Sequence, residues 1–112
     1  MINSKEQIIE YFKSGIKKTQ DFKIGIEHEK FLFNNHDNKR IDYSKVKEMF
    51  LALLEFGWNP ILEKENIIGL NKGGKNITLE PGNQIELSGD KLNHVHEACA
   101  ESQDYLFELR QV

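Results

Sequence analysis

Glutamates recur in three short apolar stretches of this chain of 112 residues. Glu27 and Glu29 lie in the first stretch, Glu80 ends the second, and Glu86 lies in the third. Successive side chains of a strand project to opposite faces, so Glu27 and Glu29 share a face. Glu80 and Glu86 each follow an apolar residue that is expected to face the other way. If the three strands pair, four carboxylates meet on one sheet surface, and their mutual repulsion predicts bound divalent cations.

A sheet face with glutamates in water is the simpler interpretation of the same pattern, and it stays open at this point. Two features favour a metal site. Glutamate is depleted in strands, and here it recurs beside Gly and Pro residues that allow another backbone to approach closely. A set of hard oxygen ligands without Cys or His is typical of magnesium or manganese rather than zinc.

Composition places the chain among soluble, single-domain proteins. Charged residues make up 29% of it and the net charge is −3, with no basic cluster, which argues against nucleic-acid binding. No apolar run approaches the length of a membrane span, and the N-terminus lacks the apolar core of a signal peptide. A single cysteine excludes an internal disulfide and fits a reducing compartment, so we expect a cytoplasmic location.

The elements that would position the glutamates follow from periodicity and turn residues. Residues 4–17, 44–56 and 90–111 show helical spacing of apolar residues, whereas residues 23–33, 61–64, 67–70, 77–80 and 84–88 are typical of strands. Short turns rich in Gly, Pro and Asn separate the later strands. This order predicts an α+β fold in which an antiparallel sheet has its helices on one side.

The last predicted helix carries two further expectations. Asp90 is the expected N-cap, and the expected buried face contains Leu92, Val95, Cys99, Leu106 and Leu109. The helical pattern runs to Val112 without a glycine stop. We therefore expect residues 1–112 to be a single partial domain, the N-terminal segment of a larger catalytic domain.

Several strings resemble a known family. GIEHEKFLF at residues 25–33, GGKNITLEPGNQIELSG at 73–89 and HEACAE at 96–101 resemble glutamate–cysteine ligase of the plant and proteobacterial type. The resemblance implies a fold similar to the catalytic domain of glutamine synthetase. It also implies the first step of glutathione synthesis, in which ATP drives coupling of the γ-carboxyl of glutamate to the amine of cysteine through γ-glutamyl phosphate.

By position, the resemblance assigns Glu27, Glu29, Glu80 and Glu86 to magnesium, with ATP as co-substrate. Gln84 and Ser88 share a face with Glu86 and are weaker candidates for substrate contact. The implied partners are ATP, L-glutamate, L-cysteine and the remainder of the enzyme chain. Two alternatives stay open: a related carboxylate–amine ligase with another acceptor, and an inactive truncated or metal-binding fragment. We expect the 112 residues alone to be inactive.

Overall fold

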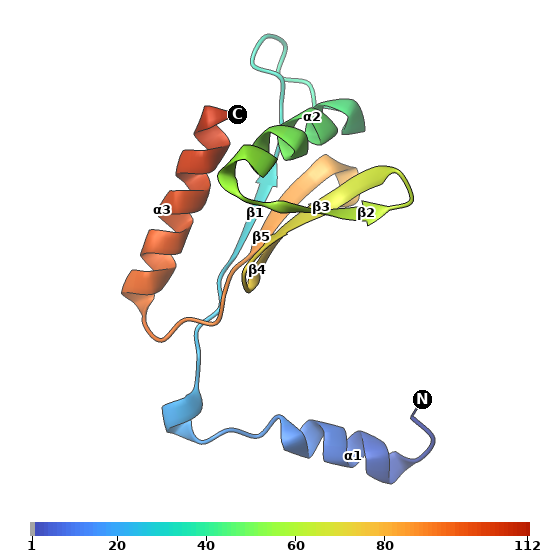
Figure 1. Cartoon of the computed structure of the whole chain (residues 1–112), viewed down its shortest axis with the longest axis vertical. Helices are drawn as coiled ribbons and strands as arrows, with labels where there is room; N and C mark the ends of the chain where they lie inside the picture. The colour runs from blue at the N-terminus through green and yellow to red at the C-terminus, as the bar shows by residue number, and fades with distance from the viewer. Residues whose placement is uncertain (1) are drawn as a thin grey trace.

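Five strands form one antiparallel sheet in the computed structural model, which describes residues 2–112. The strands are β1 (Glu27–Phe31), β2 (Asn59–Glu63), β3 (Asn66–Lys72), β4 (Lys75–Glu80) and β5 (Gln84–Ser88). Their order across the sheet is β1-β5-β4-β3-β2, so β2 to β5 are successive hairpins and β1 joins at the β5 edge (Figure 1). The predicted α+β class and antiparallel sheet are confirmed.

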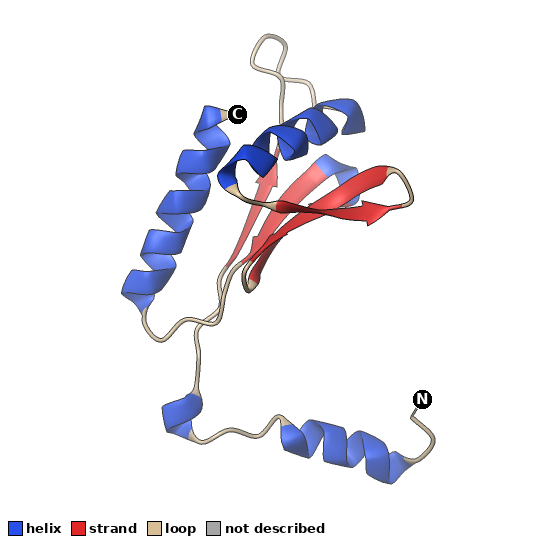
Figure 2. Cartoon of the chain, viewed as in Figure 1, coloured by secondary structure: helices blue, strands red, loops and turns tan. Residues whose placement is uncertain are grey.

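Two of the α-helices cover one face of this sheet, as the sequence predicts. They are α2 (Tyr43–Leu53) and α3 (Val95–Gln111), whereas α1 (Lys5–Ser14) lies apart from the sheet and buries none of its residues (Figure 2). Ser4 caps α1 by accepting a hydrogen bond from the Gln7 amide. In the described part of the chain, no helix is both long enough and apolar enough to cross a membrane.

The core lies between the sheet and the two covering helices. α2 contributes Val46, Phe50 and Leu53, which follow the helical spacing of an apolar stripe. The strands and α3 supply the rest of the core, namely Trp58, Ile67, Leu70, Ile77, Ile85, Leu87 and Tyr105. In β4 and β5 these apolar residues alternate with polar ones, so the opposite face of the sheet is polar.

Glycine turns set the register of the later strands. Gly73 has φ of 64° in the β3–β4 turn, and Gly82 has φ of 75° in the β4–β5 turn. These are left-handed conformations that glycine adopts without a steric penalty. With both hairpins tight, Ile77 pairs with Leu87 on the core face and Thr78 pairs with Glu86 on the polar face.

The start of α3 differs from the prediction. The helix begins at Val95 with His94 as N-cap, and Asp90 lies in the loop before it. This loop is not helical because Leu92 forms an antiparallel bridge with Ile24. The predicted buried face is wrong at two positions, since Val95 is 59% exposed and Cys99 is exposed. It is confirmed at Leu109, which packs against the core, and Leu92 and Leu106 are half-buried. The buried residues of α3 are Ala98, Glu101 and Tyr105.

Candidate functional site

The register of three strands places the four predicted glutamates on one face. Glu29 of β1 lies directly opposite Glu86 of β5, and on the other side of β5 Glu86 pairs with Thr78 of β4. Glu27 and Glu80 lie two residues along the flanking strands, so each is diagonal to Glu86. This polar surface, called the acidic face below, therefore has Glu86 at its centre.

Cross-strand repulsion is built into this face. Side chains directly opposite each other in an antiparallel pair have Cβ atoms about 5 Å apart, and like charges there are destabilising. Because Glu29 is exposed, the repulsion between Glu29 and Glu86 is about 1 kcal/mol in water-like surroundings. A cation shared by the two carboxylates would convert that repulsion into attraction.

Two hydroxyl groups orient two of the carboxylates. The Ser88 hydroxyl donates to Oε1 of Glu86 at 3.1 Å, and the Thr78 hydroxyl donates to Oε1 of Glu80 at 2.9 Å. Each donor lies two residues from its acceptor along the strand and hence on the same face. The hydrogen bonds restrict rotation of the half-buried Glu80 and Glu86, whereas Glu27 and Glu29 are exposed.

The four carboxylates share the face without forming a closed cluster. Within residues 2–112, no three His, Cys, Asp or Glu side chains lie close enough together to hold a metal ion. The donor set nevertheless suits magnesium, because it consists of carboxylate oxygens with hydroxyl groups beside them. The exposed Glu27 and Glu29 side chains can adopt other rotamers without disturbing the core.

The two weaker candidates lie where the sequence predicts. Ser88 pairs across the sheet with Glu27 and also with Asn76 of β4. Gln84 pairs with Phe31 on one side and Glu80 on the other, at the opposite end of the acidic face. Both residues share the face of Glu86, as predicted, and their contact with substrate stays a prediction.

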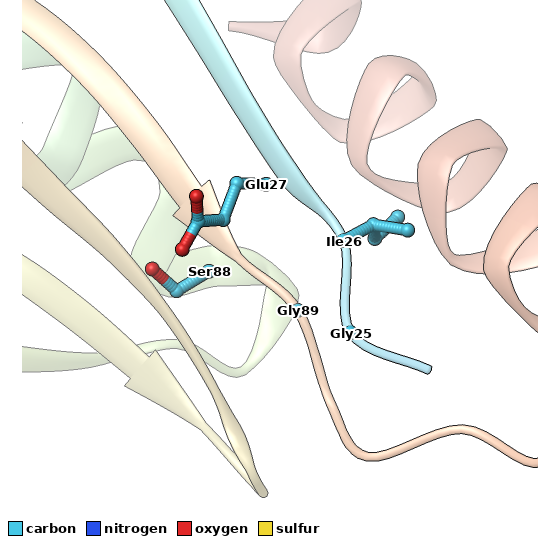
Figure 3. Close-up of a pocket in the computed structure, with 5 residues that line it drawn as sticks. All are labelled: Gly25, Ile26, Glu27, Ser88 and Gly89. Carbon is cyan, nitrogen blue, oxygen red and sulfur yellow. The ribbon is translucent and has the colours of Figure 1, made fainter. Parts of the chain in front are cut away.

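A pocket of about 390 Å³ opens beside the acidic face where β1 begins and β5 ends. It is lined by Gly25, Ile26, Glu27, Ser88 and Gly89. The side chains of Glu27 and Ser88 project to the same side of the sheet, whereas Ile26 projects toward α3 (Figure 3). Three of the five lining residues thus expose only backbone or an apolar side chain, and the polar groups are gathered at one end.

The loop that forms one wall of the pocket is held by a buried carboxylate. Glu101 of α3 is 7% exposed and accepts the Asp90 backbone N–H at 3.1 and 3.3 Å. Lys75 lies 3.8 Å from the same carboxylate. A Cβ on Gly89 would collide with Oε1 of Glu101, so this position needs glycine.

A second carboxylate of α3 binds the other strand of the β3–β4 hairpin. Glu108 accepts hydrogen bonds from Nε1 of Trp58 at 2.6 Å and from Nζ of Lys72 at 2.7 Å. Nζ of Lys72 also lies 5.5 Å from the centroid of the Trp58 ring, in a cation–π contact. Glu101 and Glu108 together attach α3 to the sheet that carries the acidic face.

Behind the acidic face, His28 occupies the side of β1 that faces α3. Its ring packs edge-on against Tyr105, with 6.3 Å between the ring centroids. Burial raises the pKa of the Tyr105 hydroxyl, so this group stays protonated throughout the neutral range. His28 lies on this side because side chains alternate along β1, between the outward-facing Glu27 and Glu29.

Sequence reasoning assigned no role to the part of the site around Arg40. The guanidinium carbon of Arg40 lies 5.0 Å from the centroid of Phe31, which follows Glu29 by two residues on the acidic face. Thr78 was missed as well, although its spacing of two from Glu80 could have identified it. No local sequence signal indicates that Arg40 reaches Phe31.

Comparison with known proteins gives one consistent family. Residues 23–112 match glutamate–cysteine ligase family 2. Over 110 residues, which is 97% of this chain, it is 40% identical to "Glutamate--cysteine ligase A, chloroplastic" of Oryza sativa subsp. japonica. The identity is 39% with "Glutamate--cysteine ligase, chloroplastic" of Medicago truncatula and 38% with the protein of the same name from Arabidopsis thaliana. The chain spans about a fifth of the length of these relatives, namely 22%, 22% and 21%.

Proposed function

The chain belongs to glutamate–cysteine ligase family 2, and from this premise we propose that it supplies the acidic wall of an ATP-dependent ligase active site. The reaction joins the γ-carboxyl group of glutamate to the amine of cysteine. One observation carries the proposal: Glu29 and Glu86 lie opposite each other on a sheet face that also bears Glu27 and Glu80.

The proposed chemistry has two steps. An oxygen of the glutamate γ-carboxylate bonds to the terminal phosphorus of ATP as the bond from that phosphorus to ADP breaks. The cysteine amine then bonds to the γ-carbonyl carbon, loses a proton and displaces inorganic phosphate. Because negative charge gathers around the transferred phosphoryl group, catalysis depends mainly on positioning and charge neutralisation.

Magnesium bound together with ATP would neutralise charge on the phosphates and on the carboxylates of the acidic face. Glu27, Glu29, Glu80 and Glu86 are the residues that would hold it. The Ser88 hydroxyl donates a hydrogen bond to Oε1 of Glu86, which leaves the other oxygen of that carboxylate available to a ligand. The Thr78 hydroxyl has the same effect on Glu80.

The pocket beside Glu27 would receive part of a substrate. Its polar end combines a carboxylate and a hydroxyl, which accept hydrogen bonds from an ammonium group. Gln84 lies at the far end of the face, where it could contact a different part of the bound substrates. We propose that the reaction takes place in the cytoplasm. The word "chloroplastic" in the names of the relatives refers to the location of those plant proteins.

The test is an assay of the full polypeptide encoded by the reading frame that contains this chain. With ATP, magnesium, glutamate and cysteine, we expect γ-glutamylcysteine to form, and Glu86→Gln should lower kcat/KM by about 100-fold or more because a ligand at the centre of the site loses its charge. The matched control is Glu65→Gln, which removes one exposed carboxylate from the β2–β3 turn and should leave turnover unchanged.

Three outcomes separate the alternatives. Faster coupling to another amine than to cysteine would favour a related ligase with a different acceptor. No coupling to any amine would favour the inactive fragment. Equal turnover of the Glu86→Gln and Glu65→Gln proteins would reject the assignment of the acidic face to the active site.

A further inference from the structure

We propose that Arg40 forms an oxyanion-binding site at the end of the acidic face, next to the Pro81–Asn83 turn. The ligand is a carboxylate or a phosphate carried by a substrate. The identity of that substrate rests on the proposed function, but the site itself rests on the packing around Arg40.

The backbone of Arg40 is held from two directions. Arg40 forms an antiparallel bridge with Phe33, and the next residue, Ile41, donates its amide to the carbonyl of Leu32 at 3.2 Å. From the other side, Nδ2 of Asn83 donates to the carbonyl of Ile41 at 2.9 Å. The segment that carries Arg40 is therefore attached both to the chain beyond β1 and to the β4–β5 turn.

The guanidinium group is positioned as well. It lies over the ring of Phe31, whose side chain is 54% exposed although it is large and apolar. A Cβ on Gly82 would lie 2.8 Å from Nη1 of Arg40, so another residue here would displace the guanidinium from its present place beside the turn. The contact with the Phe31 ring favours this position of the exposed Arg40 side chain before any ligand binds, which lowers the entropy cost of binding.

The hydrogen-bonding edge of the guanidinium is free. Arg40 makes no ion pair with any Asp or Glu among residues 2–112, although four glutamates share the neighbouring face. The cation–π contact with Phe31 pairs none of the guanidinium N–H donors with an acceptor. A fork of parallel donors matches the two oxygens of a carboxylate or a phosphate, and a lysine at the same place does not.

Arg40 lies at the end of the acidic face, where a positive group would help an anionic substrate to bind. The acidic face would repel an anionic substrate, whereas Arg40 offers a positive group at one end of that face. Phe31 connects the two, because its ring contacts the Arg40 guanidinium and it follows Glu29 on the same side of β1. One end of an anionic substrate could thus contact Arg40 while cations neutralise the rest.

The first experiment follows the side-chain Nε–Hε NMR signal of Arg40 in the chain while inorganic phosphate or L-glutamate is added. We expect a saturable shift of this signal with at least one of the two ligands. Arg110, which is exposed near the end of α3, serves as the internal reference and should shift little. Equal shifts of Arg40 and Arg110, or no saturable shift of Arg40, would overturn the proposal.

The second experiment measures the ligase kinetics of the full polypeptide with Arg40→Lys, which keeps the charge, and Arg110→Lys as the matched control. We expect a KM increase of about 10- to 100-fold for one substrate with Arg40→Lys alone. An increase for ATP identifies phosphate as the ligand, and an increase for glutamate identifies carboxylate. If Arg40→Lys left the KM values for ATP and for glutamate unchanged in an active enzyme, the proposed oxyanion site would be rejected.

The two experiments separate this proposal from the proposed function. A saturable Arg40 shift in a protein without ligase activity would support the oxyanion site and reject the ligase. Full activity together with no Arg40 shift and normal KM values would reject only the oxyanion site.

Discussion

Replacing the buried Glu101 should loosen the wall of the pocket and destabilise the folded chain. In Glu101→Ala, the Asp90 amide loses its charged acceptor, which is worth about 1.5–3 kcal/mol. The contact with Lys75 adds only about 0.2–1 kcal/mol, because Nζ of Lys75 and the Glu101 carboxylate are 3.8 Å apart, near the limit for an ion pair. We therefore expect the free energy of unfolding to fall by about 2–4 kcal/mol.

Urea denaturation followed by the fluorescence of Trp58, the one tryptophan in the chain, measures this loss. Glu101→Gln keeps the shape and one acceptor oxygen, so its loss should be smaller than that of Glu101→Ala. Gln103→Ala, at an exposed position of the same helix, should stay within about 0.5 kcal/mol of the unchanged chain. Hydrogen exchange at the Asp90 amide should accelerate in Glu101→Ala. Equal stability of the Glu101→Ala and Gln103→Ala chains would refute the reasoning.

Two other predictions concern how the helices are attached. Glu108→Gln should lower the free energy of unfolding by about 1–3 kcal/mol, because Trp58 and Lys72 lose a charged acceptor. The fluorescence emission of Trp58 should also shift to longer wavelength. Unchanged emission and stability would contradict the attachment of α3 through Glu108. In α1, Ile8→Ser combined with Phe12→Ser should change the free energy of unfolding by less than about 0.5 kcal/mol, since these side chains are 44% and 71% exposed. If urea denaturation showed the free energy of unfolding to fall by more than about 1 kcal/mol, α1 would have to pack against the sheet or its covering helices.

The acidic face could be predicted from sequence because its determinants are local. Alternation fixes which residues of a strand share a face, and tight turns at Gly73 and Gly82 fix the register of β3, β4 and β5. Glu80 and Glu86 lie on either side of one such turn, so their common face follows from a few residues. The pairing of β1 with β5 is long-range, and the sequence analysis had it only as a condition for the shared face.

The start of α3 could not be predicted because long-range contacts decide it. Asp90 is a good N-cap by type, but its amide bonds to Glu101 and the neighbouring Leu92 pairs with Ile24. A buried glutamate also defeats the rule that apolar residues mark the inner face of a helix. For this reason the sequence pattern favoured Cys99 for the core, whereas Glu101 and Tyr105 occupy it.

The packing of Arg40 likewise depends on residues far apart in the sequence. Its neighbours are Phe31 and Gly82, and the hydrogen bond that holds its segment comes from Asn83 to Ile41. No spacing rule connects these positions. The glycine at residue 82 was recognised as a turn residue, and the structure adds that it also makes room for a guanidinium group.

Binding of Mn²⁺ to the chain tests the central claim most directly, because this paramagnetic ion uses the same oxygen ligands as Mg²⁺. We expect low concentrations of Mn²⁺ to broaden the amide NMR signals of Glu27, Glu29 and Glu86 first. Excess Mg²⁺ should restore these signals, and Glu86→Gln should abolish the effect while Glu65→Gln preserves it. Broadening spread evenly over all acidic residues, or unaffected by Glu86→Gln, would contradict the claim that the acidic face binds metal.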